Sequence, residues 1–291
     1  MSADPQGMTP LFRPRHRTRL AGILIAACLA AAAESPAAEP GGAGSLLVAP
    51  TRLVFEGRTR TGELTLANKG TGAATYRIRI AFYAMSEDGD MREIPAPSVE
   101  DRAADGLIRY SPRQVTLEPG TSQVVRVALR KPVDLPAGEY RSHLVFSPVS
   151  QAAAGNAPDD ELAFKVQLNV GVAISVIVRQ GETAATVALD APVLRPGKDG
   201  APPLLDVTIR RSGDRSLYGK LVATFQPTGG RPVEVGLTKG IGVYVPNALR
   251  RFQLSLRPPA GVSLAAGRLQ VRFVDEEKGD RVLAAAELIL P

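Results

Sequence analysis

The segment that decides the fold is Leu162–Arg179, which reads LAFKVQLNVGVAISVIVR. Every even-numbered position in it carries an apolar residue, whereas the odd-numbered positions include Lys165, Gln167 and Asn169. Successive side chains of a strand point to opposite faces, so this pattern predicts one long β-strand with one apolar face. At about 3.3 Å per residue the strand would span roughly 60 Å, about three times a typical strand. Either it continues into a second partner, or its first half lies exposed at an edge.

Short apolar runs separated by turn signals fill the chain on both sides of this segment. The 28 glycines and 24 prolines fall between runs rich in Val, Ile and Leu, which is typical of many strands joined by tight turns. The turn signals Pro119-Gly120 and Ser212-Gly213-Asp214 predict hairpins over 113–129 and over 213–220. The predicted strands are 46–55, 62–67, 75–84, 113–118, 123–129, 139–146, 162–179, 186–189, 204–210, 217–225, 232–236, 242–245, 252–256, 268–274 and 282–290.

The number and spacing of these strands predict an all-β protein with two immunoglobulin-like β-sandwich domains. A chain of 291 residues is long enough for two domains that each bury a core. We place the first domain at residues 45–181 and the second at residues 182–291, with the boundary just after the long strand.

The N-terminus has the pattern of an export signal. Four arginines between Arg13 and Arg19 precede the apolar stretch from Leu20 to Ala33, which is too short to span a bilayer but fits a signal peptide. We therefore expect residues 1–33 to be a signal peptide, with cleavage somewhere in 28–38, and a periplasmic protein after export. Cys28, the one cysteine, follows Ile25-Ala26-Ala27 as in a lipobox, so a lipid-anchored form through Cys28 is the alternative.

The residue inventory argues against catalysis, metal binding and nucleic-acid binding. Without residues 1–33, the 35 basic and 29 acidic residues become 31 and 28, a net charge of +3, which is too weak a field to imply a nucleic-acid partner. His143 is the one histidine outside that segment, and its place in a strand pattern predicts a surface or packing role. With one histidine and no further cysteine, a catalytic triad or a zinc site is hard to assemble. We expect no enzyme, no metal, no cofactor and no small-molecule substrate.

An ordered set of short motifs resembles the PapD-like periplasmic pilus (fimbrial) assembly chaperones, as a divergent, non-classical member. The resemblance covers about 46–179, and the second half is compatible with the family's C-terminal domain. The motifs are Thr51–Phe55, Asn68–Gly70, Tyr110–Pro112, Leu117–Gly120, Gln123–Val127, Leu135-Pro136 and Val178-Arg179.

The resemblance implies a function in pilus biogenesis. In that family two immunoglobulin-like domains form an L or boomerang, and the last strand of the first domain donates alternating apolar side chains to an incomplete pilin. The expected partners are therefore pilin or fimbrial subunits and an outer-membrane usher. Without a client, the bare apolar edge also favours self-association.

Site residues carry over by position within those motifs. Arg52 matches the cleft arginine that holds the client's C-terminal carboxylate. The donor positions are matched by Phe164, Val166, Leu168 and Val170, and we expect Val172, Ile174, Val176 and Val178 to belong to the protein's own fold. Ser175 stands where the family has a cleft lysine, so either another basic residue replaces that lysine or the anchor differs.

A rival interpretation is a structural or adhesive envelope protein with immunoglobulin-like domains. It predicts that the long strand is fully paired within its own sheets and that Arg52 is merely exposed at the surface.

Overall fold

Burial alternates along most strands of the chain, so each sheet has one face in a core and one face outside it. The computed structural model describes residues 45–149, 171–197 and 200–291. Residues 40–291 form a compact unit of their own. The predicted signal peptide, Cys28 and the donor residues Phe164, Val166, Leu168 and Val170 lie outside the described residues.

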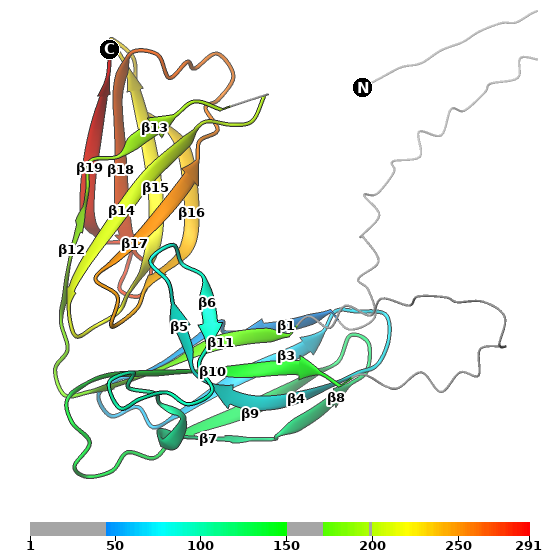
Figure 1. Cartoon of the computed structure of the whole chain (residues 1–291). Helices are drawn as coiled ribbons and strands as arrows, with labels where there is room; N and C mark the ends of the chain where they lie inside the picture. The colour runs from blue at the N-terminus through cyan, green and yellow to red at the C-terminus, as the bar shows by residue number, and fades with distance from the viewer. Residues whose placement is uncertain (1–44, 150–170, 198–199) are drawn as a thin grey trace, which may run out of the picture. The chain divides into compact units, whose positions relative to one another are not determined.

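Two sheets packed face to face form the first sandwich (Figure 1). Its four-stranded sheet has the order β1 (Leu46–Ala49), β3 (Thr61–Asn68), β9 (Ser122–Leu129), β7 (Ile108–Ser111). Its five-stranded sheet has the order β2 (Arg52–Phe55), β11 (Val172–Gln180), β10 (Gly138–Pro148), β4 (Ala74–Ala81), β8 (Gln114–Leu117). The small hairpin of β5 (Tyr83–Met85) and β6 (Met91–Glu93) and the 3-10 helix η1 (Asp105–Leu107) complete this part.

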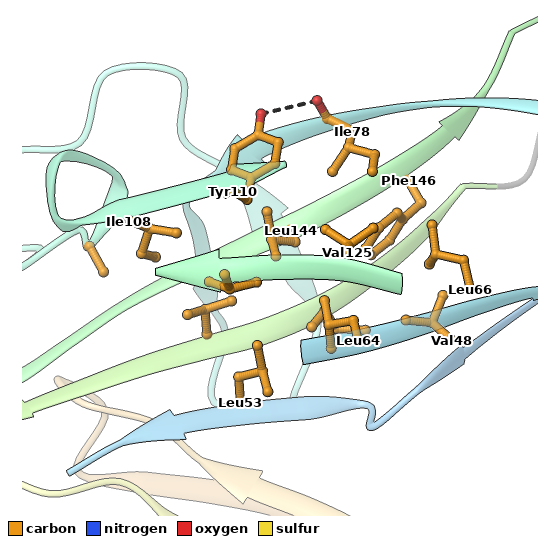
Figure 2. Close-up of a cluster of buried hydrophobic side chains, with 14 of the residues drawn as sticks. Val48, Leu53, Leu64, Leu66, Ile78, Ile108, Tyr110, Val125, Leu144 and Phe146 are labelled. Atoms are coloured by element: carbon orange, nitrogen blue, oxygen red, sulfur yellow. Dashed lines mark hydrogen bonds between the residues drawn. The ribbon is translucent and has the colours of Figure 1, made fainter. Parts of the chain in front are cut away.

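Apolar side chains from both sheets fill the space between them (Figure 2). Leu64, Leu66 and Val125 come from the four-stranded sheet, and Leu144 and Phe146 come from the five-stranded sheet. Full burial of such a side chain contributes about 1.5–3 kcal/mol. The prediction that the second half of the long strand belongs to the fold is confirmed, because Ile174, Val176 and Val178 are buried in this core and Val172 packs against it.

One buried side chain holds the turn after β3. The Asn68 amide nitrogen donates to the carbonyls of Leu117 at 3.0 Å and Gly72 at 2.8 Å, and its oxygen accepts from the Gly70 amide at 2.9 Å. At Asn68–Gly70 the side chain thus replaces backbone partners that a turn lacks.

The second sandwich follows from residue 185 onward (Figure 1). One sheet has the order β12 (Ala185–Leu189), β14 (Leu204–Gly213), β13 (Val193–Arg195), with β17 (Leu249–Ser255) also paired to β14. The other has the order β16 (Val233–Val243), β15 (Leu217–Pro227), β18 (Gly267–Asp275), β19 (Val282–Leu290). A separate apolar cluster that includes Leu205, Phe225 and Phe273 lies between them. The prediction of an all-β chain with two sandwiches is confirmed.

Both predicted hairpins are wrong. β8 pairs with β4 in the five-stranded sheet, whereas β9 pairs with β3 and β7 in the other sheet. Likewise β14 and β15 belong to different sheets of the second sandwich. A tight turn can reverse the chain within one sheet or carry it across the core, and two amphipathic strands satisfy both arrangements. The strands predicted at 232–236 and 242–245 are also a single strand, β16, with bulges in its pairing to β15.

Among the described residues, no helix is long and apolar enough to span a bilayer.

Candidate functional site

The face of the five-stranded sheet that points away from the core carries a set of buried polar residues. β-Alternation places Glu139, Arg141 and His143 of β10 on that face, while Leu144 and Phe146 point into the core. Strand register aligns His143 with Ser175 of β11, and Ser175 with Arg52 of β2. One row across three strands therefore reads Arg52, Ser175, His143.

Arg179 lies on the same face and is saturated with carboxylates. Its side chain is 1% exposed, with Nε 3.0 Å from Glu139 Oε2 and Nη1 3.0 Å from Glu56 Oε2. Its Nη2 lies 3.2 Å from Glu277 Oε2, on the chain after β18. Burial alone would lower the pKa of Arg179, but the charges of Glu139 and Glu277 raise it above its ordinary value.

Serine and arginine side chains of the second sandwich complete this network. Ser216 donates to Glu139 through its hydroxyl and, at 3.2 Å, through its backbone N–H. Arg215 donates to both carboxylate oxygens of Glu56, at 3.1 and 3.3 Å. Burial would raise the pKa of Glu56, but the hydrogen bonds from Arg179 and Arg215 lower it below its ordinary value. A buried charge set is tolerated when every member is paired in this way.

Arg52, the predicted carboxylate anchor, is buried but incompletely paired. Its side chain is 9% exposed, and Nη2 lies 2.8 Å from Glu277 Oε1. This contact is an ion pair, but none of the three guanidinium nitrogens forms a hydrogen bond with a described residue. The group stacks over the Tyr218 ring, 4.5 Å from its centroid, and lies 6.0 Å from the centroid of Tyr244. Arg52 also lines a surface pocket with Glu56, Thr59, Arg179, Arg215 and Lys278, among others.

Arg141 is a second buried guanidinium, and no motif in the sequence indicates it. The residue is 4% exposed, and its Nε and Nη1 have no hydrogen-bond partner in the described residues. It stacks over Tyr244 at 4.4 Å from the ring centroid and contacts Phe82 at 5.6 Å. Burial lowers the pKa of Arg141 below its ordinary value. The charges of Tyr244 and Glu139 act in the opposite direction, and the nearby charge of Arg52 adds to the lowering.

Tyr244 is shared by Arg52 and Arg141, and a glycine makes room for it. A Cβ atom at Gly242 would lie 2.5 Å from Tyr244 Cζ, so a larger residue there would displace the ring. Both guanidiniums thus face one aromatic ring on one face of the five-stranded sheet. Such stacking contributes about 0.5–2 kcal/mol per pair without neutralising the charge.

Ser175, which the sequence resemblance aligned with a lysine position, is engaged with His143. The Ser175 hydroxyl lies 3.2 Å from His143 Nε2, and the His143 ring meets Tyr83 edge-on at 5.1 Å between centroids. Burial, with the nearby charge of Arg141 as a second cause, lowers the pKa of His143 to about 3. The histidine is therefore a neutral, buried packing residue near pH 7, one of the two roles predicted for it.

The edge of β11 beside Arg52 is only partly covered. β2 pairs with β11 over Ser175–Val178, in parallel. Pro50 and Thr51 connect β2 to the preceding strand β1, which belongs to the opposite sheet. In the described part of the chain, no strand pairs with that edge of β11 at Val172–Ile174, which is bonded to β10 alone. The unpaired edge thus ends where Arg52 begins β2.

Comparison with known proteins found structures but no sequence relatives. No protein-family model matches the chain, and no curated protein matches it. The likeness is confined to fold. A crystal structure of the class 5 fimbriae chaperone CfaA is 13% identical, with a TM-score of 0.44, and the match covers 85% of this chain and 99% of that one.

Two further structures give similar values. The Escherichia coli chaperone DraB is 16% identical, with a TM-score of 0.42, over 86% of this chain and 98% of that chain. A structure of the Salmonella enterica SafA pilin in complex with the SafB chaperone matches at 14% identity and a TM-score of 0.42, over 85% and 97% of the two chains.

Proposed function

We propose that this protein is a periplasmic chaperone that binds pilus or fimbrial subunits by lending them a β-strand and delivers them for assembly. The observation that carries the proposal is the unpaired edge of β11 over Val172–Ile174, which ends at the buried guanidinium of Arg52. An unpaired strand edge is a template for a strand of another chain. Main-chain hydrogen bonds then supply affinity, and alternate side chains supply specificity.

The position of Arg52 sets the direction of the client strand in this proposal. Arg52 stands at the N-terminal end of β2, which is parallel to β11 on the same edge. A client strand on the free part of that edge, with its carboxyl end at Arg52, runs in the direction of β2 and is therefore parallel to β11. A guanidinium binds a carboxylate through two hydrogen bonds, which fixes the register of the added strand.

The proposed donor side chains are Phe164, Val166, Leu168 and Val170. They continue the even-numbered positions whose later members Ile174, Val176 and Val178 lie in the core, so they share the apolar face of the pattern. Burying each of them in a client contributes about 1.5–3 kcal/mol. Together the four side chains set an upper bound of roughly 6–12 kcal/mol on their contribution to the binding free energy, before the cost of ordering both chains is subtracted.

The remaining parts of the proposal concern export, partners and domain limits. The signal at residues 1–33 directs the chain to the periplasm, an outer-membrane usher receives the loaded complex, and the protein catalyses no reaction. We place the limits of its two domains at 45–181 and 182–291.

The test is periplasmic co-expression with small exported subunits encoded near its gene, followed by identification of what co-purifies. Arg52→Ala should fold as the wild type does but lose its client, because removing one partner of a charge-assisted pair costs about 2–5 kcal/mol, roughly 30- to 5,000-fold in affinity. Arg126→Ala is the matched control, since that arginine is 81% exposed beside Glu63. Full client retention by Arg52→Ala would contradict the anchor.

A structural or adhesive envelope module remains the second candidate. It predicts that no subunit co-purifies with the wild type and that Arg52→Ala changes thermal stability alone. The burial of Arg52 and the unpaired edge of β11 favour the chaperone over this candidate.

A further inference from the structure

A count of charges on the outer face of the five-stranded sheet leaves one guanidinium unmatched. Ion pairs join three arginines to three glutamates, namely Arg52, Arg179 and Arg215 with Glu56, Glu139 and Glu277. Arg141 lies beside this set and forms no ion pair with any described residue. The carboxylate nearest in sequence, Glu139, is already occupied by Arg179 and Ser216.

A buried guanidinium without a counterion is costly to a folded protein. Removing a cation from water carries a penalty that aromatic stacking repays only in part. Arg141 is 4% exposed, and two of its nitrogens have no acceptor within the described chain. The folded protein tolerates this arrangement best when an anion from outside the chain supplies the missing charge and acceptors.

We propose that Arg141 is the second cation of the client-carboxylate site and takes the place of the absent lysine at Ser175. The centroid of the Tyr244 ring lies 4.4 Å from the Arg141 guanidinium and 6.0 Å from that of Arg52, so an oxyanion beside this ring would have a guanidinium from each of two strands. The inference rests on the proposed function for the identity of the anion, a chain-terminal carboxylate. The anion site itself is independent of it.

The side chain at position 175 cannot supply the second cation, because it is a serine. Ser175 is on β11, and its hydroxyl is turned to His143 on β10. Arg141 is two residues before His143 and so points from the same face of β10. In this proposal the cationic partner of Arg52 therefore stands on β10 and not on β11.

Two measurements on the full mature chain test the assignment. The first is thermal melting with increasing sodium acetate against sodium chloride at equal ionic strength, which needs no client. Acetate should raise the Tm of the wild type and of Arg126→Met, the exposed control. Arg141→Met and Arg52→Met should each need at least roughly tenfold more acetate for the same rise, because a hydrogen bond to a charged group is lost. Arg141→Lys should keep most of the effect, since it keeps the charge.

The second measurement is client co-purification with the same variants. Arg141→Met should lose client roughly tenfold or more while the acetate-free protein melts no earlier than the wild type, because the substitution removes an unmatched charge. An early-melting Arg141→Met with an unchanged acetate response would overturn the inference, as would an unchanged response in folded Arg141→Gln. An acetate response that depends on Arg141, in a protein that captures no subunit, would retain the anion site and reject the chaperone function.

Discussion

Arg179 and Arg141 lie on the same face of the same sheet and are both almost fully buried, yet their surroundings differ. Arg179 contacts three glutamates from three parts of the chain. Arg141 has two aromatic rings and no carboxylate partner in the described residues. A buried arginine that is fully paired with carboxylates stabilises the fold, because removing it leaves those buried carboxylates unpaired. A buried arginine without a carboxylate partner can still bind an anion from outside the chain.

Replacing Arg179 should have the largest effect on stability, and it would sharpen the contrast between Arg179 and Arg141. Arg179→Met removes the cation that neutralises Glu139, and that carboxylate is 1% exposed. Breaking a buried pair from one side costs about 3–5 kcal/mol. Chemical denaturation should show this loss, whereas Arg126→Met should change stability by less than about 1 kcal/mol.

The contrast fails if Arg179→Met and Arg141→Met lose equal stability. That outcome would mean that both arginines serve the fold alone and that Arg141 holds no place for an anion.

The pH dependence of stability gives a smaller effect that reports on the surroundings of Arg141. Burial, with the Arg141 charge as a further cause, lowers the pKa of His143 to about 3, against an ordinary value of 6.5. The contribution of neutral His143 to stability is complete above the pKa that this histidine has in the unfolded chain. It is lost as the pH falls toward the pKa of His143 in the folded protein. Stability should therefore fall by about 1.4 kcal/mol per pH unit below pH 6.5, or about 2 kcal/mol between pH 6.5 and pH 5.

Denaturation curves from pH 7 to pH 5 check this slope. In His143→Gln the slope should be much shallower, and in Arg141→Met the His143 pKa should lie higher, so that less stability is lost. A slope that is the same in wild type and His143→Gln would show that other groups titrate in this range.

Much of the fold could be predicted from the sequence, because alternation is a local property. The strand over Val172–Gln180 and the turn at Asn68 follow from the residues themselves. Strand pairing could not be predicted in the same way. Pro119-Gly120 makes a turn in either case, and only packing of the whole core decides that β8 and β9 belong to opposite sheets.

The candidate site was predictable for Arg52 and not for Arg141. Arg52 stands in a motif, whereas Arg141 occupies an alternating strand where a polar residue normally faces water. The signal that was available is the run Glu139, Arg141, His143, three ionisable residues in succession on one face of a strand. That run does not indicate that residues distant in sequence, such as Tyr244 and Ser216, cover this face of the strand.

The central claim is that one strand pattern serves two proteins, with its first half for a client and its second half for the fold. The most direct test is thermal melting together with client co-purification for Leu168→Ser beside Ile174→Ser. Ile174 is 2% exposed, so Ile174→Ser should lose about 3–5 kcal/mol through a cavity and a buried hydroxyl. Leu168→Ser should melt as the wild type does and capture no client. If both variants melt early and alike, the whole segment is ordinary core and the claim is wrong.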